Sequence, residues 1–152
     1  MTYTAAKGRQ QILDALGAAA DEIASALALL SEAYEHLDEN TAERLEAGLF
    51  QPTQAAYGRA KRVHAGFAGR HDLPSREFST PSQVAPASGT KGLIDAAVDA
   101  AAKADGMLAE LQDSMLPVEV GDPELRAGLS EVRELVGGLR ARAREVTRTL
   151  GR

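Results

Sequence analysis

The feature that most constrains this chain is an unbroken heptad pattern of apolar residues in its first third. Intervals of three and four positions alternate without a miss between residues 13 and 37. This spacing puts the apolar side chains on one stripe of an α-helix, and it is typical of coiled-coil helices that pack along their whole length. The stripe consists of Leu13, Leu16, Ala20, Ile23, Leu27, Leu30, Tyr34 and Leu37.

The composition supports helices that approach one another closely. Hydrophobic residues make up 44% of the 152 residues, but 29 of them are alanine, with three Phe and no Trp. Alanine is the best helix former, and a sheet would need more β-branched and aromatic residues. Cysteine is absent, which excludes disulfides, zinc–thiolate sites and thiol nucleophiles.

The first half of the chain predicts a long helix followed by a shorter one. We expect helix at about residues 5–47, a C-terminal cap at Gly48, and a second helix at about 52–70 that begins with Pro52. In an alternative interpretation, Asn40 and Glu43 form a capping box and the first helix ends near Leu37. We prefer the first interpretation because Gly48 and Pro52 bracket a short loop.

A Pro/Ser-rich linker is predicted at residues 72–90, where the density of proline excludes a helix. Ser88 and Thr90 are candidate N-caps of a third helix at about 91–115, which Pro117 would end. Its apolar stripe consists of Ile94, Ala97, Ala101, Ala104, Leu108, Leu111 and Met115.

A fourth helix is predicted at about 123–150, with Asp122 as its N-cap and Pro123 in its first position. Gly137 and Gly138 interrupt it, either as a kink or close helix crossing or as tolerated glycines, and we prefer the latter. Its apolar stripe consists of Leu125, Leu129, Val132, Val136, Leu139, Ala143, Val146 and Leu150.

The sequence therefore predicts an all-α fold. We expect a single domain over 1–152, a four-helix bundle of two antiparallel hairpins (about 5–47/52–70 and 91–115/123–150). Net charge alternates along the chain: −6 over 1–50, +3 over 51–90, −5 over 91–122 and +3 over 123–152. Antiparallel pairing would place acidic helices beside basic ones.

No catalytic set stands out, so we predict that the chain is not an enzyme and holds no cofactor or metal. Glu32, Glu35 and His36 have helical metal-ligand spacing, but a solvated acidic face explains them better. Residues 88–92 lack the spacing of a phosphate-binding loop. A metal- or ligand-binding bundle remains an alternative.

Charge and hydropathy limit the classes of partner that we expect. The last helix carries Arg126, Arg133, Arg140, Arg142, Arg144, Arg148 and Arg152, but glutamates are interspersed with them. With a net charge of −5, nucleic acid is not the expected partner. No apolar run is long enough to span a bilayer and no signal-peptide pattern is present, so we expect no membrane partner and a cytoplasmic location.

A weak resemblance points to another setting. The hairpin over residues 12–69 resembles WXG-type proteins of type VII secretion, and the Ala/Arg/Gly-rich composition and the stretch LQDSMLPVEVGDPEL at 111–125 resemble small helical actinobacterial proteins. Tyr34 and Asp38 match the Tyr-x-x-x-Asp pattern of that family's export signal, which implies export without a cleaved signal peptide. The chain lacks the tryptophan of the WXG turn, and Tyr34 also fits the apolar stripe, where we expect a core tyrosine.

We therefore predict a non-enzymatic helical interaction module whose partner is a protein, most simply a second copy of the chain. A first helix of about 43 residues would extend well beyond the second. Either the third and fourth helices or a second copy of the chain would cover the excess, and we prefer a homodimer. The candidate interaction seam consists of Leu16, Ile23, Leu27, Leu30, Leu129, Val132, Val136 and Leu139. A secreted protein or adaptor linked to type VII secretion, with Tyr34 and Asp38 as its candidate export motif, is the alternative.

Overall fold

The computed structural model describes residues 2–81 and 89–150, and the regular elements in these ranges are all helices. The predicted all-helical fold is thereby confirmed for this part of the chain. In order, the elements are α1 (Thr2–Glu35), α2 (Glu39–Leu45), the π-helix η1 (Glu46–Phe50), α3 (Gln51–Arg70), α4 (Gly89–Asp113), α5 (Leu116–Glu119), α6 (Pro123–Gly137) and α7 (Leu139–Leu150).

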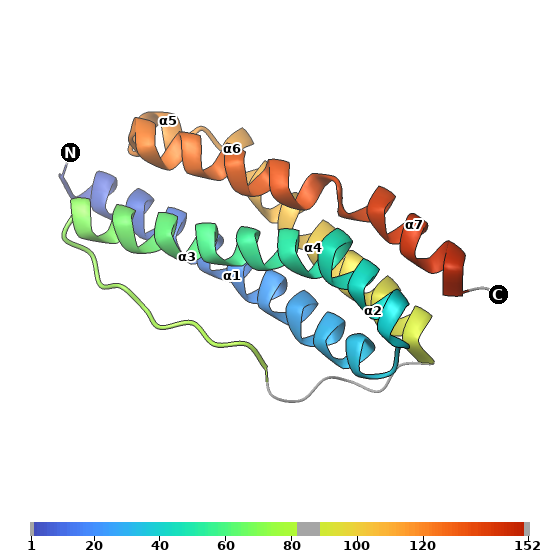
Figure 1. The fold of residues 1–152 in the computed structure, drawn as a ribbon. Coiled ribbons are helices and arrows are strands. Elements are labelled where there is room, and N and C mark those ends of the chain that lie inside the picture. The colour runs from blue at the N-terminus through green and yellow to red at the C-terminus, as the bar shows by residue number, and fades with distance from the viewer. Residues whose placement is uncertain (1, 82–88, 151–152) are drawn as a thin grey trace.

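The long helices lie side by side in an elongated bundle (Figure 1). The chain runs along α1 and returns along α3, residues 73–81 then lie outside the bundle, and α4 runs in the direction opposite to α1. The helices of each predicted hairpin touch one another, but the most extensive contacts join the two halves, α1 with α4 and α3 with α6. The halves therefore share one core.

The first predicted boundary is wrong, because α1 ends at Glu35 and a new helix begins at Glu39. The alternative end near Leu37 is close to the observed one. The cap, however, is Asp38 and not Asn40: Asp38 has extended backbone angles, and its carboxylate accepts a 2.9 Å hydrogen bond from the backbone N–H of Thr41. An aspartate in this position satisfies a helix donor that otherwise has no partner.

The second predicted boundary is also wrong, because Gly48 caps no helix and lies inside η1. Pro52 has no N–H, and its ring would clash with the carbonyl four residues earlier in a regular α-helix. A π-turn absorbs this conflict: Gln51 N–H donates to the carbonyl of Glu46, five residues back, and the Thr53 hydroxyl donates to the carbonyl of Leu49 at 2.7 Å.

Helix therefore continues from Glu39 to Arg70 through α2, η1 and α3, which have 7, 5 and 20 residues. The antiparallel α1 has 34 residues, so the two lengths match. The predicted excess of the first helix over the second does not exist. Because the two lengths match, this reason for expecting a second copy of the chain no longer applies.

The second half follows its predicted ranges more closely. Helix α4 starts and ends two residues before the predicted positions, and Thr90 lies inside it and is not its N-cap. Ser88 lies outside the described residues. Pro117 does not end α4 but lies in the first turn of α5, after a turn in which Met115 has φ +69°. Asp122 caps α6 as predicted, accepting a 2.8 Å hydrogen bond from Leu125 N–H.

The two glycines break the predicted fourth helix. Helix α6 ends at Gly137, Gly138 is its C-cap, and α7 begins at Leu139. A β-carbon on Gly137 would meet nothing within 4 Å, so no close helix crossing explains the pair. The preferred interpretation of tolerated glycines is wrong, and the kink is correct.

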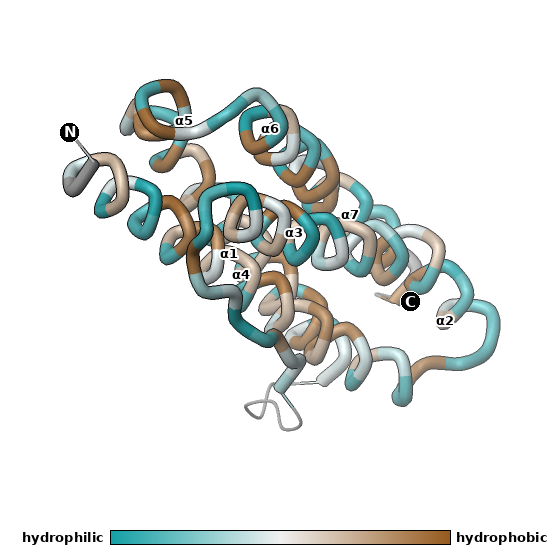
Figure 2. Tube along the Cα trace, turned by 90° about the vertical axis from the view of Figure 1, so that its left-hand side faces the viewer, coloured by the Kyte–Doolittle hydropathy of each residue, from teal (hydrophilic) through white to brown (hydrophobic). Residues whose placement is uncertain are grey.

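Most residues of the apolar stripes belong to one hydrophobic cluster, and brown, hydrophobic positions recur along the long helices in Figure 2. Tyr34 and Met115 are exceptions to the predicted stripes, because they are 42% and 50% exposed. Small residues let the helices approach closely. A β-carbon on Gly128 of α6 would overlap the Val63 side chain of α3, while Ala97, Ala101 and Ala104 lie buried along α4.

The ion pairs follow the predicted charge pattern in the second half only. Arg133 of α6 contacts Asp105 of α4 at 2.7 Å, and Arg140 of α7 contacts Asp99 at 3.4 Å. In the first half, the basic residues of α3 reach α6 instead: Arg59 contacts Glu131 at 2.9 Å and Arg70 contacts Asp122 at 2.8 Å.

Candidate functional site

The predicted interaction seam lies inside the protein. All eight of its residues are at most 5% exposed and belong to the common core. A side chain that is already buried within its own chain offers no surface to a partner. The seam therefore explains how this chain folds, and a partner must use other residues. The eight residues are Leu16, Ile23, Leu27, Leu30, Leu129, Val132, Val136 and Leu139.

The candidate export residues lie at a turn and not within a helix. Tyr34 is in the last turn of α1 and is 42% exposed, so the expected core tyrosine is wrong. Asp38 is the exposed N-cap of α2, where hydrogen bonds from the backbone and side chain of Thr41 lower the pKa of its carboxyl group. This cap gives Asp38 a structural role of its own.

A groove between α1 and α3 hollows the described surface. It has a volume of about 850 Å³, and a smaller hollow of about 330 Å³ shares Ser31, Glu35 and Phe50 with it. We call the two together the α1–α3 groove. It is lined by Leu27, Ala28, Ser31, Glu32, Tyr34, Glu35, Glu46, Phe50, Gln54, Tyr57, Gly58, Lys61, Thr80 and Pro81.

The chain itself lies against the region next to this groove. After α3, Arg76 pairs with Asp21 of α1 through two contacts of 2.6 and 3.1 Å. Its guanidinium also lies 4.2 Å from the ring centre of Phe78, and Phe78 packs edge-on against His64 of α3. A β-carbon on Gly17 would come within 3.0 Å of the guanidinium, so glycine leaves room for this arginine.

Two buried polar atoms near this segment have no hydrogen-bond partner among the described residues, the Tyr57 hydroxyl and Nδ1 of His64. Tyr57 is 6% and His64 3% exposed. Burial, followed by the charge of Arg76, lowers the pKa of His64, so the ring is neutral at pH 7. Burial, followed by the charge of Asp21, raises the pKa of Tyr57. Buried polar groups without partners are uncommon in folded proteins, which makes this region the candidate site.

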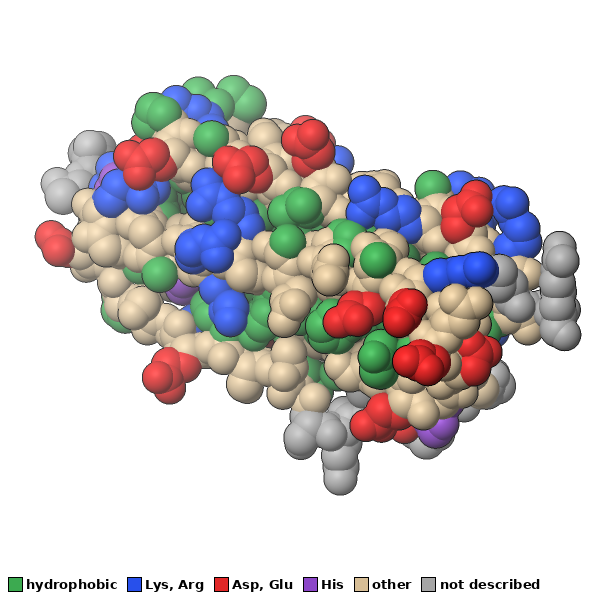
Figure 3. All heavy atoms as spheres, in the orientation of Figure 1, with side chains coloured by type: hydrophobic (Ala, Val, Ile, Leu, Met, Phe, Trp, Pro, Cys, Tyr) green, Lys and Arg blue, Asp and Glu red, His purple; other side chains and the backbone are tan. Residues whose placement is uncertain are grey.

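One end of the groove is acidic. Figure 3 shows a group of red carboxylates where α1 meets α2 and others over α6, while blue basic groups lie along α3 and α7. Glu32 contacts His36 at 3.2 Å, and no Lys or Arg of the described residues pairs with Glu35 or Glu46. Within residues 2–81 and 89–150, no three His, Asp or Glu side chains are grouped so that they could hold a metal ion.

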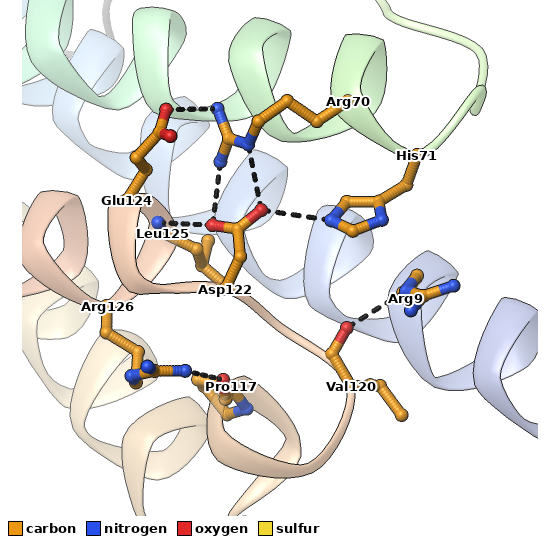
Figure 4. A network of polar contacts seen from close by, with 9 residues as sticks. All are labelled: Arg9, Arg70, His71, Pro117, Val120, Asp122, Glu124, Leu125 and Arg126. Atoms are coloured by element: carbon orange, nitrogen blue, oxygen red, sulfur yellow. Dashed lines mark hydrogen bonds and ion pairs between the residues drawn. The ribbon is translucent and has the colours of Figure 1, made fainter.

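The opposite end of the bundle holds a different polar cluster, centred on Asp122 (Figure 4). Its carboxylate accepts hydrogen bonds from Arg70 at 2.8 and 2.9 Å and from Leu125 N–H at 2.8 Å, and it contacts His71 at 2.9 Å. The Arg70 guanidinium is the main reason why the pKa of Asp122 lies well below its usual range. Arg70 also contacts Glu124 at 3.1 Å.

Neighbouring backbone groups complete this cluster, which we call the Asp122 clamp. Arg9 of α1 donates to the Val120 carbonyl at 2.9 Å, and Arg126 of α6 donates to the Pro117 carbonyl at 3.1 Å. A β-carbon on Gly121 would collide with the Pro117 carbonyl oxygen. The clamp joins α1, α3, α5 and α6, and its polar groups are bonded to one another, so it holds the fold together.

The remaining candidates are surface features. In α7, Arg140 and Arg148 form ion pairs of 3.4 and 3.2 Å, and Arg152 lies outside the described residues. At α5, Met115 and Val118 are 50% and 57% exposed. No helix in the described ranges combines the length and hydropathy needed to cross a bilayer.

Sequence reasoning missed the groove. Tyr57 and His64 flank the apolar face of their helix, which is a weak signal. Arg76 and Phe78 lie in the linker, where nothing in the pattern marks them. Comparisons of the chain with protein-family models, with curated proteins and with solved structures find no match.

Proposed function

We propose that this protein is a non-enzymatic helical module that binds other proteins through the α1–α3 groove. The observation that carries the proposal is the groove itself, open to solvent and lined by the aromatic side chains of Tyr34, Phe50 and Tyr57. Aromatic side chains are enriched at protein interfaces because they combine a large apolar area with few rotatable bonds.

A bulky residue in the groove tests this proposal. Ala28 lines the groove and is half-buried, whereas Ala102 is exposed on α4, away from it. Ala28→Trp should abolish capture of the partners that the wild-type protein retains from cells that express it natively, and Ala102→Trp should not. Identical sets of captured proteins for all three, as measured by quantitative mass spectrometry, would contradict binding in the groove.

Self-association is a second form of protein binding that we propose, and it would use neither the buried seam nor the α1–α3 groove. Met115 and Val118 at α5 are the exposed apolar pair that a homodimer would bury. Light scattering over a wide concentration range should then give a dimer, and Val118→Glu should shift it to a monomer. A strict monomer at high concentration would exclude the homodimer and leave a foreign protein as the partner.

A second candidate function, export through type VII secretion, is favoured by the exposure of Tyr34 beside the turn that contains Asp38. Asparagine caps a helix as well as aspartate does, so Asp38→Asn removes the charge and keeps the cap. Both Tyr34→Ala and Asp38→Asn should abolish export while the circular dichroism spectrum stays unchanged. Export of both variants at the wild-type level would remove this candidate.

A further inference from the structure

We propose that the acidic end of the α1–α3 groove binds an extended, arginine-bearing peptide segment of a partner protein. The proposal rests on the proposed function, and it adds the chemistry and conformation of the bound segment. Three observations carry it: how the chain's own segment binds beside the groove, which carboxylates remain beyond that segment, and what the Tyr57 hydroxyl lacks.

The first observation is an internal example of the binding mode. Residues 73–81 form no helix and no strand, and they place Arg76 on the Asp21 carboxylate with the Phe78 ring against its guanidinium. Bidentate arginine–carboxylate pairs are strong and directional, and an aromatic ring adds a favourable face for the cation. This surface already holds an extended segment through one arginine.

The second observation is that the same face of α1 continues with carboxylates that no Lys or Arg of the described residues neutralises; Glu32 contacts only His36. Glu32 and Glu35 follow Asp21 by eleven and fourteen positions, close to three and four helical turns at about 3.6 residues per turn. Both line the groove. Glu46 lines the smaller hollow from η1 together with Glu35, and Glu32 and Glu35 line the larger one, so three carboxylates lie along the two connected hollows.

The chain supplies little charge to neutralise these carboxylates. Lys61 lines the groove, but its ammonium lies 4.4 Å from the centre of the Tyr57 ring and forms no ion pair within the described residues. Residues 82–88, which follow Pro81, contain no Lys or Arg in their sequence. Charge complementarity therefore favours a cationic occupant that comes from another molecule.

The third observation is the buried Tyr57 hydroxyl. Tyr57 lines the groove, is 6% exposed, and its hydroxyl has no partner in the described part of the chain. A buried hydroxyl without a partner has lost its hydrogen bonds to water and gained none in return, which is unfavourable. A backbone carbonyl of a bound extended segment would accept its hydrogen bond, because an extended segment offers carbonyl groups that no helix occupies.

The test uses the full chain and a labelled ten-residue peptide of alternating arginine and proline. Such a peptide is extended, with about 3.1 Å per residue. Its arginines recur about 6 Å apart, near the rise of about 4.5 Å between Glu32 and Glu35 at 1.5 Å per residue. Fluorescence anisotropy should show saturable binding, while a glutamine–proline peptide of equal length should not bind. Equal binding of both peptides would overturn the proposal.

Paired charge variants separate local contact from the general attraction of an acidic protein. Glu32→Gln with Glu35→Gln should weaken binding of the arginine peptide at least tenfold. Glu119→Gln with Glu134→Gln, two exposed residues of α5 and α6, changes the net charge equally and should leave the affinity within twofold. Equal losses in the two pairs would overturn the proposal.

Tyr57→Phe tests the third observation. The variant should bind the arginine peptide several-fold more weakly, while its midpoint of thermal unfolding stays the same or rises. An unchanged affinity would count against the proposal. Failure of this proposal can be told apart from failure of the proposed function. If Ala28→Trp abolishes capture of native partners but the arginine peptide does not bind, then the groove binds proteins through segments that are not arginine-bearing.

Discussion

The polar groups at the two ends of this bundle differ in whether they have hydrogen-bond partners. In the Asp122 clamp, the carboxylate of Asp122 bonds to Arg70, His71 and a helix N–H. In the α1–α3 groove, the buried Tyr57 hydroxyl lacks a partner within the described residues, as does Nδ1 of His64, which packs against Phe78 and does not line the groove. Satisfied polar networks stabilise and specify a fold, whereas unsatisfied buried groups lower stability. The comparison indicates that the clamp stabilises the bundle, whereas the polar groups of the groove contribute less to its stability, as the binding role proposed above requires.

The largest effect should come from the clamp. Asp122→Ala removes the α6 cap and leaves Arg70 and His71 without their acceptor. Loss of a cap costs about 1 kcal/mol and loss of hydrogen bonds to a charged group about 1.5–3 kcal/mol, so we expect a loss of about 3 kcal/mol in the free energy of unfolding. Urea denaturation measures it, and Asp122→Asn, which keeps the cap, should lose less. A loss below 1 kcal/mol for Asp122→Ala would contradict the assignment.

Gly121→Ala should have the next largest effect, because its β-carbon would collide with the Pro117 carbonyl oxygen. Overpacking of this kind costs about 1–3 kcal/mol, and the turn before α6 must shift to relieve it. Thermal unfolding should show the loss. The control is Gly69→Ala, where a β-carbon meets nothing within 4 Å, and its midpoint should not fall. Equal midpoints for Gly121→Ala and the wild type would show that the turn is not tightly held.

Acid should lower stability through His64 of α3 before it affects the clamp. The pKa of His64 is lowered in the folded protein, mainly by burial. Below a pH of about 6.5, His64 binds a proton in the unfolded chain more readily than in the folded chain. The free energy of unfolding therefore decreases as the pH is lowered, by at most about 1.4 kcal/mol per pH unit. The charge of Arg76 disfavours protonation of His64, and the charge of Asp14 favours it. Urea denaturation between pH 7 and 5 measures the slope.

His64→Phe should reduce this pH dependence, and substitution of the exposed His36 should not. The pKa of Asp122 is also lowered, so its contribution is present above the unfolded pKa of about 3.9 and is lost only as pH falls further. A pH 7-to-5 slope that is the same in His64→Phe and the wild type would refute the role of His64.

The smallest effect should be that of Tyr57→Phe on folding. Removal of a buried hydroxyl that has no partner removes a desolvation penalty and no bond, so the free energy of unfolding should change by less than about 0.5 kcal/mol or rise slightly. Urea denaturation measures this change. A decrease of more than 1 kcal/mol in the free energy of unfolding would mean that the hydroxyl forms a hydrogen bond in the folded chain. Tyr57 would then not differ from the hydrogen-bonded groups of the clamp.

Much of the helical content could be predicted from the sequence, because local patterns specify it. The Asp122–Pro123 pair fixes the start of α6 through a local cap, and the end predicted for α3 near residue 70 is observed. Errors arose where two local signals competed. Gly48 and Pro52 resemble a loop, but the π-turn keeps the helix continuous. The heptad pattern runs through Tyr34 and Leu37, but the Asp38 cap starts a new helix there.

The candidate site could not be predicted in the same way. Asp21, Tyr57 and Arg76 come from two helices and a linker, and no spacing in the sequence relates them. Arg76 pairs with Asp21 at a separation of 55 residues, so only the path of the linker over α1 and α3 brings them together. The seam residues, by contrast, were correctly placed on the apolar face of their helices, although the structure uses that face for its own core.

The sequence by itself determined that this chain is helical and which stripe of each helix is apolar, since helix propensity, caps and periodicity act over a few residues. Only the tertiary structure decided that α1 packs mainly on α4, that the stripes close into one internal core, and which carboxylates stay outside it. Those choices depend on contacts between residues far apart in the chain, such as Val63 on Gly128, where the fit of one surface to another sets the arrangement.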